Sequence, residues 1–188
     1  MNRFFKPIKY LGILTVVIVI SAVITYIINP NLSDTLNSVS SNVPKSVSQK
    51  VVAYIFNNGF KVPIGIIDKI NIPIRFLYWI HPLFTVILPG ISFGIVFRYS
   101  LAKGFVILIS SLPHMLFEVF AFCVWMVALD QFNKWIRYKI SKKKSADTNL
   151  LKELKLLLSP YIKYVLPLIV IAAFTETYVA DWISHILS

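Results

Sequence analysis

The 188-residue chain contains 57% hydrophobic and only 14% charged residues, and its mean hydropathy is +0.73. Because polar side chains are too few to cover a soluble globule and several apolar runs reach bilayer-spanning length, the composition excludes a soluble domain and predicts an integral membrane protein. The net charge is +11, yet nine of the nineteen Lys and Arg residues lie between Lys134 and Lys163, beside membrane segments and without an aromatic-interleaved basic groove, which indicates anionic lipid headgroups as the partner and excludes nucleic acid.

The first apolar run, Leu11–Ile28, follows three basic residues. It is about eighteen residues long, longer than the 7–15 residues of a cleaved signal peptide, and no small-residue cleavage site follows it. We therefore expect residues 1–29 to form an uncleaved anchor helix with a cytoplasmic N-terminus. The polar residues 30–50, rich in Ser and Asn, are typical of an exposed extracytoplasmic loop.

Three further runs are clear spans: Phe76–Phe97, Gly104–Leu129 and Tyr164–Trp182. Four spans in total would place the basic segment after Leu129 outside, against the positive-inside rule. A fifth crossing by Val51–Ile70 removes the conflict. An alternative repair breaks Gly104–Leu129 at Pro113 into a re-entrant hairpin, since proline removes a helix hydrogen bond.

We favour the five-span interpretation, an all-α polytopic transmembrane bundle with its N-terminus in the cytoplasm and its C-terminus outside. Residues 1–188 then form a single transmembrane domain. Its parts are an anchor helix (1–29), an extracytoplasmic loop (30–50), central helices (51–129), a basic cytoplasmic loop (130–160) and a C-terminal helix (161–188). Within the basic loop, Leu150–Leu158 has the pattern of an amphipathic helix on the inner membrane surface.

Ionisable residues within the spans are the strongest functional signal. His114 and Glu118 are four residues apart, so they share one helix face. If that helix enters the membrane near Gly104, His114 lies about 15 Å deep and Glu118 one turn deeper. Glu176, about 9 Å below the outer surface if the last helix ends near Trp182, reaches an overlapping depth. Three further residues could add polar groups to this cluster: Asn57, Asn58 and His81.

Such a cluster has three possible uses. One histidine and two carboxylates (His114, Glu118 and Glu176) could bind a divalent metal such as zinc and leave positions open for water. Without a metal, a carboxylate could act as general acid or base with His114 as its partner. A polar network could instead only hold helices together. The His-x-x-x-Glu spacing does not decide between them, because the second histidine of the zinc-protease helix motif is missing.

Other chemistries lack their motifs. The sequence contains no Walker loop, no glycine-rich dinucleotide turn, no Cys-x-x-Cys pair and no Gly-x-Ser-x-Gly elbow. This excludes a pump subunit with its own nucleotide site. The single cysteine, Cys123, allows no internal disulfide and is expected to be a small buried hydrophobe.

Four short motifs resemble those of the stage II sporulation protein M family of bacterial membrane proteins. In chain order they are Ile55-Phe-Asn57-Asn58, Gly90-x-x-x-Gly94, Leu112-Pro-His114-x-x-x-Glu118 and Ala172-Ala-Phe-x-Glu176-x-Tyr178-Val179. The order and placement agree from Val51 to Trp182, whereas Met115 stands where the family usually has glycine. The Asn-Asn motif also agrees with a span at residues 51–70.

The resemblance implies a role at the bacterial plasma membrane. Some members take part in sporulation engulfment, working with cell-wall hydrolases, and shorter relatives are similar to proteins encoded beside circular bacteriocins. We therefore expect a factor for circular bacteriocin maturation (leader removal or cyclisation) or export, acting on a hydrophobic cationic peptide precursor and working with other membrane subunits or a transporter. Non-enzymatic immunity or scaffolding and sporulation engulfment are the alternatives.

Overall fold

In the computed structural model, which describes residues 5–28, 46–70, 74–140 and 150–187, the described elements are all helical. The α-helices are α1 (Phe5–Ile28), α3 (Val47–Phe56), α4 (Val62–Ile70), α5 (Ile80–Tyr99), α6 (Leu101–Ile140), α7 (Leu150–Pro160), α8 (Leu166–Phe174) and α9 (Asp181–Leu187). A 3₁₀ turn, η2 (Leu77–Trp79), precedes α5. Three π-helical segments interrupt the longer helices: η1 (Asn57–Lys61), η3 (Tyr161–Val165) and η4 (Thr175–Ala180).

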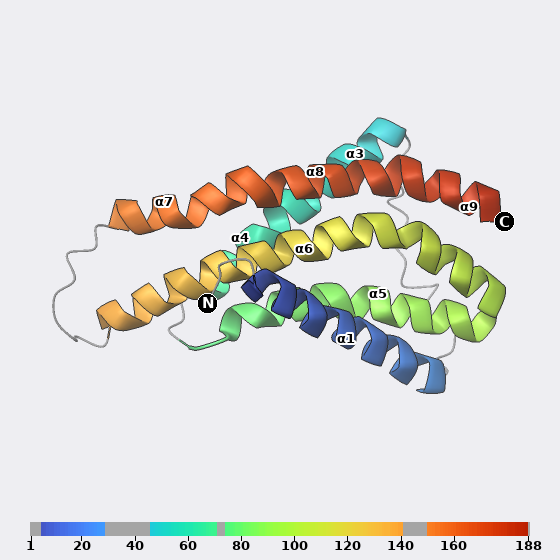
Figure 1. The fold of residues 1–188 in the computed structure, drawn as a ribbon, viewed down its shortest axis with the longest axis horizontal. Coiled ribbons are helices and arrows are strands. Elements are labelled where there is room, and N and C mark those ends of the chain that lie inside the picture. The colour runs from blue at the N-terminus through green and yellow to red at the C-terminus, as the bar shows by residue number, and fades with distance from the viewer. Residues whose placement is uncertain (1–4, 29–45, 71–73, 141–149, 188) are drawn as a thin grey trace.

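These elements form five passes that run in alternating directions along the bundle (Figure 1). The first pass is α1, the second α3–η1–α4, the third η2–α5, the fourth α6, and the fifth the continuous stretch from α7 to α9. In the described part of the chain, four helices are long and apolar enough to cross a membrane: Lys6–Ile28, Leu77–Tyr99, Leu101–Ile140 and Leu150–Leu187. The prediction of a membrane helical bundle is confirmed. The second pass, which is not one of these four helices, lies where the sequence predicted a fifth, more polar crossing.

Small residues bring α5 against α1. A Cβ atom added at Gly90 would lie 2.6 Å from the Ile18 carbonyl oxygen and 2.7 Å from Ser21 Cβ. One added at Gly94 would lie 2.6 Å from Thr25 Cβ. Only glycine allows this approach of the two backbones, as in the small-xxx-small interfaces of membrane helices. The Gly90-x-x-x-Gly94 motif therefore packs two passes of the same chain together.

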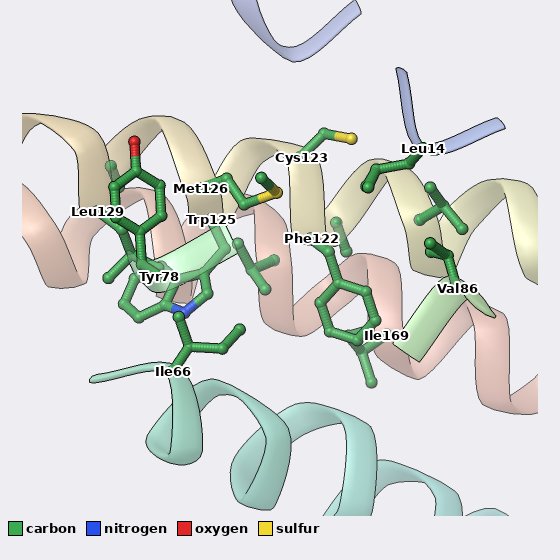
Figure 2. Close-up of a cluster of buried hydrophobic side chains, with 14 of the residues drawn as sticks. Leu14, Ile66, Tyr78, Val86, Phe122, Cys123, Trp125, Met126, Leu129 and Ile169 are labelled. Carbon is green, nitrogen blue, oxygen red and sulfur yellow. The ribbon is translucent and has the colours of Figure 1, made fainter. Parts of the chain in front are cut away.

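The fourth pass lies at the centre of the bundle and supplies more of the buried core than any other pass. Phe122, Cys123 and Met126 of α6 are fully buried. Figure 2 shows them with side chains of five other elements, among them Leu14 of α1 and Ile169 of α8. The burial of Cys123 agrees with its expected role as a small hydrophobe.

The described parts of the predicted basic loop, residues 130–160, are helical. Residues 130–140 extend α6, and residues 150–160 form α7, which continues through Pro160 into the fifth pass. With 40 residues, α6 is about 60 Å long, whereas the hydrocarbon core of a bilayer is about 30 Å thick. Both helices project together beyond the start of α1 (Figure 1). Residues 141–149 of the predicted loop lie outside the described residues.

Two other expectations differ from the structure. The alternative re-entrant hairpin is wrong, because α6 continues without a break through Pro113. In the predicted extracytoplasmic loop, α3 already begins at Val47, where the side chain of Ser46 caps it by accepting a hydrogen bond from the Gln49 backbone N–H. The remainder of that loop, residues 30–45, lies outside the described residues.

Candidate functional site

His114 and Glu118 share one face of α6, and Tyr54 of the second pass packs against both. The Tyr54 hydroxyl donates a hydrogen bond to Glu118 Oε2. Its ring meets the His114 ring edge-on, with centroids 6.5 Å apart and planes at 89°. Tyr54 thus connects α3 to the two residues that the sequence singled out on α6.

Glu176 of η4 lies close enough to Tyr54 and Glu118 to interact with both electrostatically. Its Oε2 atom is buried and accepts no hydrogen bond from the residues that the structure describes, and the buried Nδ1 atom of His114 likewise has no partner among them. Buried polar atoms without partners cost free energy, so groups of this kind need an explanation. The structure therefore brings together the three predicted residues and leaves two of them with unused hydrogen-bonding capacity.

The two asparagines join this group through Tyr54. Asn57 Nδ2 donates to Asn58 Oδ1 at 2.8 Å, and the buried Asn58 side chain interacts with the Tyr54 hydroxyl. We refer to the six residues Tyr54, Asn57, Asn58, His114, Glu118 and Glu176 as the Tyr54 cluster. It is built from the second, fourth and fifth passes.

His81 does not belong to the Tyr54 cluster. It lies in the first turn of α5, and a Cβ atom added at Gly65 of α4 would lie 3.3 Å from His81 Cε1, so the imidazole packs closely on α4. In Figure 1 this junction of α4 and α5 lies toward the end of the bundle where α1 starts. The expectation that His81 adds a polar group to this cluster is not met, because His81 lies at the contact between α5 and α4.

Two π-helical segments position the asparagines and Glu176. Asn57 and Asn58 start η1, and Glu176 lies in η4. A π-bulge inserts one extra residue into a helix, rotates the side chains that follow, and occurs frequently at functional sites. The tight packing of η1 depends on the fifth pass, where the Tyr161 hydroxyl donates a hydrogen bond to the Gly59 carbonyl.

Metal binding gains no support from this geometry. Within the residues that the structure describes, no three or more His, Cys, Asp and Glu side chains are grouped so that they could hold a metal ion. The residues His114, Glu118 and Glu176 are near neighbours without forming a ligand set. We therefore derive no chemistry through zinc or another metal.

The family comparison covers all of these passes. A protein-family model described as Stage II sporulation protein M matches residues 10–181, nearly the whole chain. The chain belongs to the stage II sporulation protein M family. Searches of curated proteins and of solved structures found no match.

The family motifs in this chain have two different structural roles. Gly90 and Gly94 join the first and third passes, whereas the asparagine pair, the His-x-x-x-Glu pair and Glu176 meet in the Tyr54 cluster. Tyr54 was not recognised from the sequence. Its position four residues before Asn58, on the same helix face, is the signal that could have identified it.

A second polar cluster lies near the start of α1 and joins three elements of the bundle. The Asp130 carboxylate accepts hydrogen bonds from Tyr78 at 3.0 Å and Lys134 at 2.7 Å, and Lys6 approaches it to 3.9 Å. The Asp130 side chain is only 12% exposed. The sequence pattern predicts Asp130 only as the first residue of a loop, whereas in the structure it links α1, η2 and α6.

Proposed function

We propose that this membrane protein takes part in the maturation of a circular bacteriocin, by leader removal or cyclisation, or in its export. The observation that carries the proposal is the Tyr54 cluster, which gathers one histidine and two carboxylates within a bundle of membrane-spanning helices. An ionisable side chain at membrane depth costs about 2.5–3.5 kcal/mol on insertion scales, so a group of three is a candidate functional site.

The arrangement supports acid–base chemistry on a peptide. Maturation requires attack on a peptide carbonyl by water or by an amine, and the attacking group must lose a proton while the leaving group gains one. Glu118, oriented by the Tyr54 hydroxyl, and Glu176, with one unpaired oxygen, are the groups that would exchange these protons. His114 would orient the peptide or share the proton through its unpaired Nδ1 atom.

Charge supports an orientation in the bacterial plasma membrane. Lys6, Lys134 and Arg137 lie near the start of α1 or on the projecting part of α6, and α7 adds Lys152 and Lys155. The positive-inside rule favours this basic end as cytoplasmic, in contact with anionic headgroups. A hydrophobic cationic precursor would then reach the two carboxylates from within the membrane, where opposite charges attract strongly.

The test is mass spectrometry of the peptides made by the native host when the chromosomal gene encodes Glu118→Gln. This change keeps the side-chain shape and removes the titratable carboxylate. We expect precursor or linear peptide to replace a product that is lighter by one water. Glu153→Gln on the distant helix α7 is the matched control and should leave the circular product unchanged.

An unchanged circular product from Glu118→Gln cells would overturn the maturation role. A non-enzymatic scaffold or immunity role is the second candidate, because the hydrogen bond from Tyr54 to Glu118 also fastens α3 to α6. In that role, conservative substitutions would act through the amount of protein in the membrane. Engulfment is the third, and genes for wall hydrolases in place of a small hydrophobic precursor beside this gene would favour it.

A further inference from the structure

Two buried N–H donors near Asp130 have no acceptor among the described residues. They are the Nδ2 atom of Asn133 and the Nε1 atom of Trp79. Asn133 is only 1% exposed, so bulk water does not reach its side chain. A buried donor without an acceptor costs free energy, and each such group needs an explanation. The surroundings of Asp130 are therefore short of acceptors, whereas at Glu176 in the Tyr54 cluster the unused atom is itself an acceptor.

Both donors flank the Asp130 carboxylate, yet it does not serve them. The Trp79 indole lies near the Tyr78 hydroxyl without hydrogen-bond geometry, and that hydroxyl donates to Asp130 Oδ1 at 3.0 Å. Asn133 follows Asp130 by three residues, so the two share one face of α6. The other carboxylate oxygen, Oδ2, accepts from Lys134 at 2.7 Å. Both oxygens of Asp130 are thus already in use.

Cationic side chains outnumber carboxylates around these donors. Lys6 lies 3.9 Å from Asp130 Oδ2, beyond hydrogen-bond distance, because Lys134 already occupies that oxygen. Arg137 donates through Nε to Asn133 Oδ1 at 3.0 Å, which uses one of the five N–H donors of its guanidinium. Three cations therefore share one carboxylate, and the amide with the unused donor is the one that Arg137 contacts.

This group of residues is accessible from the end of the bundle. The start of α1 lies beside α6 just after the apolar run that ends at Leu129 (Figure 1). The side chains of Lys6 and Lys134 are 33% and 52% exposed, so these long cations can turn toward a ligand at the membrane surface. Arg137 is half-buried, so a ligand that it binds lies next to the Asn133 amide.

A phosphate group has the chemistry that this arrangement lacks. Its oxygens only accept hydrogen bonds, and it carries the negative charge that would balance the surplus cations. The planar fork of an arginine binds two phosphate oxygens at once, and hydrogen bonds between charged partners are about twice as strong as neutral ones. A neutral ligand would fill the vacant donors without balancing the charge.

We propose that this end of the bundle binds one phosphate group, that of an anionic phospholipid or a free phosphate, between Lys6, Lys134 and Arg137. Arg137 binds two of its oxygens, Asn133 donates to it through Nδ2, and Lys6 turns from Asp130 to the phosphate. The site is saturable and holds one phosphate per chain, unlike the general attraction of basic residues to a membrane. It does not depend on the peptide-maturation role.

The test is native mass spectrometry of the purified full-length protein in detergent, titrated with dioleoylphosphatidylglycerol. We expect one bound lipid per chain, with a dissociation constant raised about tenfold or more by Arg137→Gln through loss of charge-assisted hydrogen bonds. Lys139→Gln is the matched control: it removes the same charge from an exposed position on the opposite face of α6 and should change little. Equal weakening by both variants would mean that net charge alone attracts the lipid, and would overturn the proposal.

A second variant keeps the charge. Arg137→Lys loses the fork and the bond to Asn133, so it should also weaken binding, whereas an unchanged affinity would refute the site. Circular dichroism of each variant controls for folding.

Inorganic phosphate distinguishes the two sources of the ligand. Phosphatidylglycerol that millimolar inorganic phosphate does not displace assigns the site to a lipid headgroup. Binding of inorganic phosphate without binding of phosphatidylglycerol assigns it to free phosphate. A wild-type protein that binds neither would overturn the proposal and leave water as the acceptor for Asn133.

Discussion

At the scale of single residues, Tyr54 connects the parts of the candidate site that sequence spacing alone could not join. His114 and Glu118 are predictable as neighbours because they lie four residues apart on one helix. Their contact with α3 is long-range and depends on packing of the second pass against α6 and η4. A phenol that donates to a carboxylate fixes which oxygen remains available, so in the proposed function Tyr54 would act as a positioning residue for Glu118.

Removal of the Tyr54 hydroxyl should separate positioning from folding. We expect Tyr54→Phe to keep the ring against His114 and to lose the bond to Glu118, with a stability cost near the membrane average of about 0.6 kcal/mol. Peptide maturation, measured as the ratio of circular to linear product, should fall far more than this cost implies. Tyr99→Phe, on an exposed residue at the end of α5, is the control.

Normal maturation by Tyr54→Phe would show that Glu118 needs no orientation by this hydroxyl. Loss of maturation in proportion to loss of protein from the membrane would instead assign the hydrogen bond to folding. Only a lower product ratio at equal protein level supports the positioning role.

At the scale of helices, the close contact between backbones was partly predictable from the sequence, whereas the π-helical segments were not. The Gly90-x-x-x-Gly94 spacing is visible in the sequence, although its partner α1 is not. The π-segments that present Asn58 and Glu176 have no such sequence pattern, because an extra residue in a helix is stabilised by tertiary bonds such as that from Tyr161 to Gly59. Asp130 is a similar case, since its partner Lys6 is distant in sequence.

The glycine contact gives a prediction for helix packing. Gly90→Leu should destabilise the protein by about 1–3 kcal/mol or more, because the new side chain meets the α1 backbone and forces α1 and α5 apart. Gly12→Leu is the matched control, since a Cβ atom there has nothing within 4 Å. The buried thiol of Cys123 provides the readout: the temperature at which it reacts with a fluorogenic maleimide reports unfolding.

Equal midpoints for Gly90→Leu and the wild-type protein would mean that α1 is not held to α5 by this contact. The same variant should also change the reactivity of Cys123 below the midpoint, because Cys123 belongs to the core that includes Leu14 and Ile18 of α1. A shift in Gly12→Leu of the same size would attribute the effect to the leucine itself.

At the scale of the whole molecule, the packing of the bundle around α6 explains why the second pass can be more polar than the other four. The first, third, fourth and fifth passes supply apolar surface, while the second places its buried face, with Asn58 and Gly59, against the fifth. Composition was enough to predict the bundle, and the charge distribution was enough to predict an additional pass at residues 51–70. Its polar contacts were not predictable, because Tyr54 bonds to Glu118 and Gly59 to Tyr161, each more than sixty residues away in the sequence.

The number of crossings decides on which side of the membrane each loop lies. With five passes and a cytoplasmic N-terminus, Lys103 after the third pass is outside and Lys139 at the end of α6 is inside. With four crossings, in which residues 47–70 stay on the outer side, these two positions exchange sides. The two arrangements therefore make opposite predictions for a membrane-impermeant reagent.

On a Cys123→Ser background in intact cells, a membrane-impermeant maleimide should label Lys103→Cys and leave Lys139→Cys unlabelled until the membrane is permeabilised. Both side chains are exposed in the structure, so protein packing does not protect either of them. The opposite pattern would reverse the direction of α6 across the membrane, so that the end of the helix nearer to His114 and Glu118 would lie on the cytoplasmic side. A peptide substrate would then have to reach the carboxylates from the cytoplasmic side, before export rather than during it.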